Sequence, residues 1–200
     1  MLEYKSIEAL AAAAVRAGRK ISEVVLADQA EQLGMTQDEL YGRMEARLAV
    51  MEDSVRAGMN PGLRSRVVAA PTAGSCGILP GTVVSMLAEG RCDRRAAVLS
   101  LFTAGAFGMV IAQNASIAGA EGGCQAECGS ASAMAAAALT ELMGGSPAQC
   151  AHACAMAIKN QLGLVCDPVA GLVEIPCIKR NVSGVAIAFS SAEMALAGIE

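Results

Sequence analysis

The sequence predicts an all-α fold, and three observations lead to that class. In the first sixty residues, apolar side chains recur every three to four positions, which is the spacing of one helix face. No segment alternates apolar and polar residues between hairpin turns, so no strand is predicted. Of the 200 residues, 54% are apolar but only 2% are aromatic, so small aliphatic side chains must form the core. We therefore expect a compact helical domain with a buried apolar central helix and site loops rich in glycine and proline.

Residues 1–60 are predicted to form amphipathic helices that pack on the core. The first helix is expected to end near Gly18 and the second near Gly34, because glycine accepts the left-handed backbone that ends many helices. Thr36 followed by Glu39 forms a capping box, in which each side chain accepts a hydrogen bond from the other residue's backbone N–H. A third helix is therefore expected to begin there.

Residues 61–200 differ in composition, with few charges and many small residues, and are expected to form the core that carries the site. The two parts together are expected to make one domain. Ser146 and Pro147 supply a cap and a first-turn proline for one helix of this core. Residues 165–181 are predicted to be rich in turns. The predicted helices cover residues 82–90, 96–120, 130–145, 147–163 and 185–200.

The uncharged run over residues 96–120 is long enough to span a bilayer. It also contains polar residues, among them Ser100, Thr103 and Gln113, and a helix that is apolar on all sides can form the buried centre of a globular fold. We expect that buried helix and no membrane partner. The formal charge of −4 offers no basic surface to nucleic acid. No secretory signal is visible, so the eight cysteines are expected to be reduced thiols in the cytoplasm.

The candidate metal ligands are Cys124, which follows Gly122–Gly123, Cys166, which precedes Asp167–Pro168, and Cys177, which follows Pro176. Iron–sulfur clusters are held by cysteine thiolates, and turns let the backbone bend around such a bulky group. If three thiolates held a cluster, one iron would stay open to act as a Lewis acid on a substrate oxygen. Buried structural cysteines are an equal alternative, because the spacing matches no usual zinc pattern. Cys128 is the weaker candidate, and burial is expected for Cys92, Cys150 and Cys154.

The loop "PTAGSCGILPG" is a candidate anion-binding segment, with Thr72, Gly74 and Ser75 as substrate-binding residues. Glycine allows close backbone approach, and backbone N–H groups beside a helix start can hold a carboxylate. An ordinary turn between helices is the alternative. Asn114, an amide in an apolar run, is a further substrate-binding candidate. The sequence does not identify the general base, for which it offers few side chains: His152, Lys159, Lys179, Asp167 and Glu121.

Four stretches carry a resemblance: "AAPTAGSCGILPG", "LFTAGAFG", "NASIAGAEGGCQAECGSASAMAAAAL" and "NQLGLVCDPVAGLVEIPCIKRN". They resemble the α chain of the bacterial iron–sulfur-dependent L-serine dehydratases, as does the amino-terminal segment. The resemblance implies a [4Fe–4S] cluster on Cys124, Cys166 and Cys177, with no pyridoxal phosphate. It implies conversion of L-serine to pyruvate and ammonia, with the cluster acting as a Lewis acid on the substrate hydroxyl. It also implies a β chain or β domain as partner, and an oligomer.

Two departures from the family pattern accompany the resemblance. The counterparts of "MNPGLRS" and "RVVAAPTAG" are joined directly here, whereas the family has an intervening segment, and the family continues beyond "ALAGIE" through a tail. The shortened chain leaves three functional hypotheses open. They are an L-serine ammonia-lyase, a related L-cysteine desulfidase-like lyase, and an inactive cluster-binding or scaffold fragment.

Overall fold

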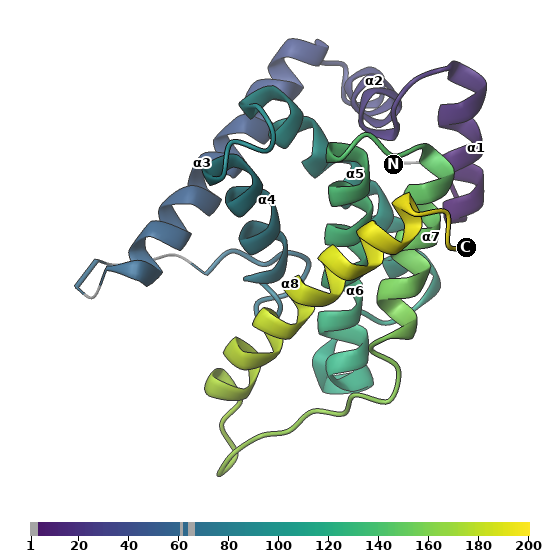
Figure 1. The fold of residues 1–200 in the computed structure, drawn as a ribbon. Helices are drawn as coiled ribbons and strands as arrows, with labels where there is room; N and C mark the ends of the chain where they lie inside the picture. Colours follow the sequence, from purple (N-terminus) through teal and green to yellow (C-terminus); the bar gives the residue numbers. More distant parts are fainter. Residues whose placement is uncertain (1–3, 61, 64–66) are drawn as a thin grey trace.

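The computed structural model describes residues 4–60, 62–63 and 67–200, and this part of the chain contains eight α-helices and no β-strand (Figure 1). The all-α prediction is therefore confirmed. In chain order the helices are α1 (Ile7–Ala17), α2 (Ile21–Leu33), α3 (Gln37–Met59), α4 (Ile78–Ala88), α5 (Arg94–Asn114), α6 (Gly119–Leu142), α7 (Pro147–Lys159) and α8 (Glu174–Leu196).

The ends of several helices follow the local signals in the sequence. Helices α1 and α2 end at Gly18 and Gly34, which have φ angles of 62° and 63°. The capping box at the start of α3 is present, because the Thr36 and Glu39 side chains each accept from the other residue's backbone N–H. Helix α7 begins with Ser146 as its cap and proline in its first turn. These starts and ends depend on a few neighbouring residues, so the sequence predicts them well.

Helix α6 lies at the centre of the fold and packs against α5, α7 and α8 (Figure 1). All of its residues from Cys128 to Glu141 are buried, and most of them are Ala, Ser or Gly. Such small side chains let the neighbouring helices approach closely on every side. Helix α5 is also largely buried. It is long and apolar enough to cross a membrane, but 67% of its most apolar window is buried inside the protein, as in a core helix.

Several helix boundaries differ from those expected from the sequence. Helix α5 stops at Asn114 instead of continuing to residue 120. Helix α6 begins at Gly119 instead of residue 130, and α4 and α8 also begin earlier than expected. Residues 174–181, predicted to be turns, therefore belong to α8. Pro80 and Pro176 lie in the first turns of α4 and α8, where a missing N–H breaks no intrahelical hydrogen bond. Pro80 and Pro176 therefore mark the starts of helices, whereas the sequence pattern predicted that they lie in loops and turns.

The amino-terminal helices pack on the rest of the fold: α1 against α7, α2 against α5, and α3 against both α4 and α5. The boundary between residues 1–60 and 61–200 stays a prediction. The expected junction after "MNPGLRS" falls partly on residues 61 and 64–66, which lie outside the described residues.

Candidate functional site

A cavity of about 430 Å³ lies at the amino-terminal end of α6. The three candidate cysteines line it together with Gly74 of the predicted anion-binding loop. Its walls come from the loop before α4, the first turns of α6 and α8, and the segment between α7 and α8. The full set of lining residues is Gly74, Gly119, Ala120, Gly123, Cys124, Glu127, Cys166, Val173 and Cys177.

The three cysteines come from different elements and differ in exposure. Cys124 is buried and directly follows Gly123, where α6 bends with φ 69° and ψ −166°. A Cβ at Gly123 would lie 3.1 Å from the backbone nitrogen of Cys166, so the bend also lets the α7–α8 segment come close. Cys166 is exposed on that segment, and Cys177 lies partly buried in the first turn of α8.

The segment that carries Cys166 is held from both sides. From α6, the Gln125 backbone N–H donates to the Leu164 carbonyl at 2.8 Å, and the Gln125 side-chain oxygen accepts from the Gly163 N–H at 2.9 Å. From α8, Arg180 forms an ion pair with Asp167 at 3.1 Å. These contacts place Cys166 opposite the other two cysteines, although the segment has no regular structure beyond a tight turn at residues 169–172.

Asn181 joins the predicted anion-binding loop to α8. Its Nδ2 donates to the carbonyl oxygens of Gly74 and Cys177, both at 2.6 Å. Its Oδ1 accepts from the Gly77 N–H at 2.8 Å. One side chain therefore satisfies backbone groups of the loop and of the first turn of α8. These hydrogen bonds fix the position of Gly74 relative to Cys177, which lie on two walls of the cavity.

Glu127 brings a carboxylate to the cavity. The Thr72 hydroxyl donates to its Oε1 at 2.6 Å, and the Thr72 and Ser75 hydroxyls are 2.8 Å apart. A Cβ at Gly74 or at Gly119 would lie only 2.6 Å from Glu127 Oε2, so both glycines make room for this carboxylate. The predicted residues Thr72 and Ser75 therefore lie close to the cysteine cavity, where Thr72 orients Glu127 and Ser75 supports Thr72.

Sequence reasoning missed Glu127 and Asn181, although both stand in stretches that carry the family resemblance. Glu127 follows Cys124 by about one helical turn, and Asn181 follows Cys177 by a similar interval. A polar side chain one turn after a candidate ligand on the same helix face was the available signal. It was weak because the helical state of residues 174–181 was not predicted.

Several residues named from the sequence lie outside the cavity lining. Asn114 uses its amide to donate to the carbonyl oxygens of Val110 and Lys5, at 2.8 and 3.1 Å. Glu121 accepts a hydrogen bond from the Ser116 hydroxyl at 2.6 Å. His152 lines a separate groove between α1 and α7. A substrate contact at Asn114 and a base among the other candidates stay predictions.

The surroundings of Cys177 and Cys128 disfavour their thiolate forms. Burial raises the pKa of Cys177, and the charges of Glu127 and of the other two cysteines raise it further. Burial, together with Cys124 and Glu127, raises the pKa of Cys128 to about 12. A metal centre reverses this preference, because a coordinating thiol loses its proton outright.

Cysteine thiolates are the ligands that hold iron–sulfur clusters. The three candidate cysteines line one cavity and come from three elements. Across the described ranges, no group of three His, Cys, Asp or Glu side chains converges closely enough to hold a single metal ion. Cys124, Cys166 and Cys177 are therefore the residues that could hold an iron–sulfur cluster.

The fold and the site describe a helical protein that gathers cysteines and a carboxylate around one cavity. The family of the serine dehydratase alpha chain matches residues 60–200, so the chain belongs to that family. It is 42% identical over 224 residues to a probable L-serine dehydratase, alpha chain, of Bacillus subtilis, covering 90% of this chain and 74% of the relative. It is 59% identical over 133 residues to the corresponding protein of Latilactobacillus sakei, covering 66% and 64%. The L-serine dehydratase, alpha chain, of Peptoniphilus asaccharolyticus is 56% identical over 135 residues, covering 68% and 46%.

The match to the Bacillus subtilis protein also bears on the expected internal difference. It extends over 224 residues, more than this chain has, yet includes only 90% of the chain. The relative therefore has several dozen residues within the matched region that have no counterpart here. This agrees with the shortened connection expected between the third predicted helix and the "PTAGSCGILPG" loop.

Proposed function

We propose that the chain acts as the α chain of an L-serine dehydratase, a cytoplasmic enzyme that converts L-serine to pyruvate and ammonia without pyridoxal phosphate. We further propose that Cys124, Cys166 and Cys177 hold a [4Fe–4S] cluster. The observation that carries the proposal is the meeting of these cysteines and Glu127 at one cavity, in a member of the serine dehydratase alpha chain family.

When bound, the cluster supplies Lewis acidity that helps the substrate hydroxyl leave as water. Loss of water from L-serine yields aminoacrylate, which becomes the imine and is hydrolysed to pyruvate and ammonia. The chain's own residues hold the substrate for this step. Glu127 projects a carboxylate at the cavity, with Thr72 bonded to Oε1, so its Oε2 can accept a hydrogen bond from the α-ammonium group. Backbone N–H groups near Gly74 are suited to the substrate carboxylate.

The first test measures iron and acid-labile sulfide per chain after anaerobic reconstitution. Four of each, as in a cubane cluster, is the expected result. Cys166→Ala and Cys177→Ala should each lose most of that iron while helical content by circular dichroism stays the same. Cys150→Ala is the matched control, because Cys150 is buried on α7 away from the cavity and should leave the iron content unchanged. Equal iron in all three variants would refute the ligand assignment.

Activity is tested after the β chain of a relative is added, since we propose a β chain as partner and an oligomer as the working form. Pyruvate formed from L-serine supports the proposed function. Sulfide released from L-cysteine without turnover of L-serine would favour the desulfidase hypothesis. A full cluster with neither activity would favour a cluster-binding scaffold. That hypothesis is retained because the Bacillus subtilis relative has residues within the matched region that have no counterpart in this chain.

A further inference from the structure

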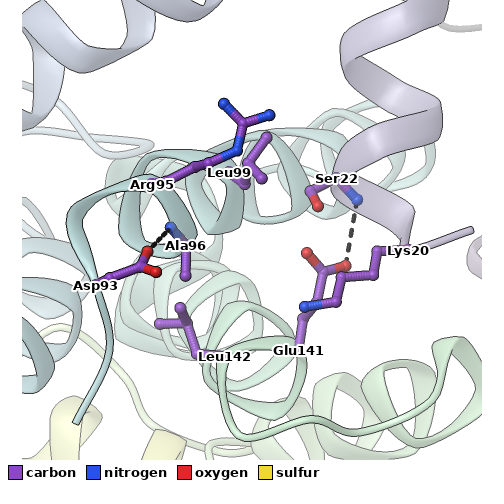
Figure 2. A pocket seen from close by; sticks show the side chains of 8 residues that line it. All are labelled: Lys20, Ser22, Asp93, Arg95, Ala96, Leu99, Glu141 and Leu142. Atoms are coloured by element: carbon purple, nitrogen blue, oxygen red, sulfur yellow. Dashed lines mark hydrogen bonds between the residues drawn. The ribbon is translucent and has the colours of Figure 1, made fainter.

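A second cavity, of about 140 Å³, lies at the opposite end of α6 (Figure 2). At about 1.5 Å per residue, Glu141 lies roughly 25 Å along the helix from Cys124, so the two cavities are separate. The second cavity lies where the first turns of α2 and α5 meet the last turn of α6. Its lining residues are Lys20, Ser22, Asp93, Arg95, Ala96, Leu99, Glu141 and Leu142.

Glu141 is a buried carboxylate that lacks a cationic partner in the described part of the chain. It is only 4% exposed. Its Oε2 accepts from the Ser22 backbone N–H at 3.2 Å and from the Thr103 hydroxyl at 2.9 Å, and Oε1 accepts from neither. Glu141 thereby caps the start of α2, where the Lys20 side chain makes no capping hydrogen bond. Capping accounts for one oxygen, but a buried carboxylate is normally paired with a positive charge.

Ser22 provides a second, independent observation. Its side chain is 0% exposed, and its hydroxyl has no hydrogen-bond partner. Buried hydroxyl groups nearly always have a partner. In the described part of the chain, the buried hydroxyls of Ser22 and Ser191 have none, and of these two only Ser22 lines this cavity. In Figure 2 the Ser22 and Glu141 side chains face the same side of the cavity. A ligand atom between them could satisfy both the hydroxyl and the unused carboxylate oxygen.

Positive side chains line the same cavity. Lys20 is exposed, and its side chain runs beside Glu141 in Figure 2 without an ion pair within 4.0 Å in the described residues. Arg95 is held over the Tyr41 ring, with its guanidinium carbon 5.5 Å from the ring centroid. Asp93 is already engaged as the cap of α5, where it accepts from the Ala96 N–H at 2.7 Å. The groups that line the cavity without a hydrogen-bond or ion-pair partner among the described residues therefore include one carboxylate oxygen of Glu141, the buried Ser22 hydroxyl and the exposed Lys20 ammonium.

We propose that this cavity binds a small amino acid in its zwitterionic form. The ammonium group of the ligand would donate to Glu141 Oε1 and to the Ser22 hydroxyl, and its carboxylate would pair with Lys20. The volume is close to the roughly 150 Å³ that accommodates benzene in an apolar cavity, so the ligand has about six or seven non-hydrogen atoms. Glycine, L-alanine and L-serine meet this limit. The site stands on residues that the proposed dehydratase chemistry does not use.

The experiment measures binding of glycine, L-alanine and L-serine to the cluster-free chain by titration calorimetry. Cluster-free chain is used so that no iron is available to bind the ligand. Methylamine and acetate serve as probes of the separate charged groups, and each should bind far more weakly than L-alanine. The wild-type chain should bind about one L-alanine molecule per chain. No binding of any of the three amino acids at tens of millimolar would overturn the proposal.

Three variants identify the site. Glu141→Gln keeps an acceptor for the α2 cap but removes the charge, and it should weaken L-alanine binding by at least about tenfold. Ser22→Ala removes an unsatisfied hydroxyl, so it should bind more weakly while its Tm stays equal or rises. Lys20→Met should weaken acetate and L-alanine binding but leave methylamine binding unchanged. If Ser22→Ala and Lys20→Met both bind L-alanine as the wild type does, the proposal is wrong, even if Glu141→Gln fails to fold.

A fourth variant separates this proposal from the proposed dehydratase function. Glu127→Gln should bind L-alanine with unchanged affinity, because Glu127 lines only the cysteine cavity among the described cavities. Loss of binding in Glu127→Gln would show that the ligand occupies the cysteine cavity and would refute the second site. Conversely, binding that persists in Glu127→Gln, when the wild-type chain takes up no iron on reconstitution, would support the second site while the dehydratase proposal failed.

Discussion

At the scale of single residues, the cysteine cavity depends on glycines at positions where any side chain would meet a neighbouring atom. Gly123 has a positive φ, which disfavours every residue with a Cβ, and its added Cβ would also meet the backbone of residues 164–166 at 3.1 Å. Gly74 and Gly119 leave space for the Glu127 carboxylate. These glycines therefore determine how close the walls of the cavity can come.

Gly123→Ala should impair the cavity more than it impairs the fold. Alanine with this backbone (φ 69°, ψ −166°), which essentially only glycine adopts, costs about 1–3 kcal/mol, and the close contact with residues 164–166 adds to that cost. We expect a lower Tm and loss of most reconstituted iron. Gly105→Ala is the control, because a Cβ there meets no atom within 4 Å and alanine favours the helix. Full iron content in Gly123→Ala would contradict the importance of the bend.

Glu127→Gln should raise the KM for L-serine without removing the cluster. Glutamine can still accept from Thr72, but the charge that would bind the substrate ammonium is gone. Loss of a hydrogen bond to a charged group costs about 1.5–3 kcal/mol, so KM should rise at least about tenfold. Steady-state kinetics with the β chain present provide the measurement. Glu31→Gln, at an exposed residue of α2 outside the cavity lining, should behave as the wild type.

At the scale of elements, neighbouring helices are joined by a small number of side chains. Asn181 links α8 to the loop before α4, and Gln125 links α6 to the segment after α7. On α7, Cys150 and Cys154 lie four residues apart on the buried face. They pack as small apolar groups, which agrees with the burial expected for them from the sequence.

Asn181→Ala should release the loop before α4 from α8. The Gly77 amide would lose its acceptor, and the carbonyl of Gly74 would lose its donor. Hydrogen exchange should therefore accelerate over residues 70–77, while exchange in α5 and α6 stays slow. Lys179→Ala, at an exposed neighbouring position of α8, is the control. Unchanged exchange in the loop would mean that other contacts hold it.

The buried thiol of Cys154 should make stability fall at high pH. Burial raises its pKa from 9.0 to about 12 in the folded chain. Between those values the unfolded chain releases this proton and the folded chain keeps it, so the free energy of unfolding decreases as pH rises above 9. Each such group contributes at most about 1.4 kcal/mol per pH unit. Below pH 9 both states keep the proton, and this dependence disappears.

Urea unfolding of wild-type chain and Cys154→Ala at pH 8, 9 and 10 would measure that contribution. The variant will be less stable at pH 8 because it loses packed atoms, but its stability should decrease less steeply between pH 9 and 10. Parallel curves for the two proteins would show that the thiol does not titrate as expected.

At the scale of the whole molecule, the segment that carries Cys166 exposes several apolar side chains beside the cavity. In Figure 1 this segment, residues 160–173, extends beyond the ends of the helices that it joins. The exposed side chains include Leu162, Val165, Val169 and Leu172 of the segment, together with Ile175 in the first turn of α8, each more than half exposed. Apolar groups gathered on a surface are typical of sites that another protein covers.

If a β chain is the partner, it should cover this segment. Hydrogen exchange over residues 162–175 should slow when the β chain of a relative is added. The double substitution Val169→Ser and Leu172→Ser should weaken that binding while leaving the Tm nearly unchanged, because both side chains are exposed. Leu33→Ser, at an exposed apolar residue on α2, is the control. Binding that is equally strong in the double variant would place the partner on another surface.

The sequence alone determined the features that depend on near neighbours. Apolar spacing predicted the helical class, and caps at Thr36 and Ser146 predicted where two helices begin, because both signals act within one or two turns. The resemblance in the "EGGCQAECGS" and "LVCDPVAGLVEIPC" stretches named three cysteines that the fold then brought to one cavity. The three cysteines could be named from the sequence because each lies within a short motif that resembles the family's.

Only the tertiary structure decided which side chains meet across the fold. Glu127 acquires its role from Thr72 and from the two glycines beside it, which are distant in the sequence. Asn181 depends on the loop before α4, and the Glu141 cavity exists because α2 and α5 begin where α6 ends. These contacts depend on how closely and at what angle the helices pack. A helix rich in small residues, such as α6, can pack against its neighbours in many ways. The sites form only in the one arrangement that the packing of the whole core stabilises.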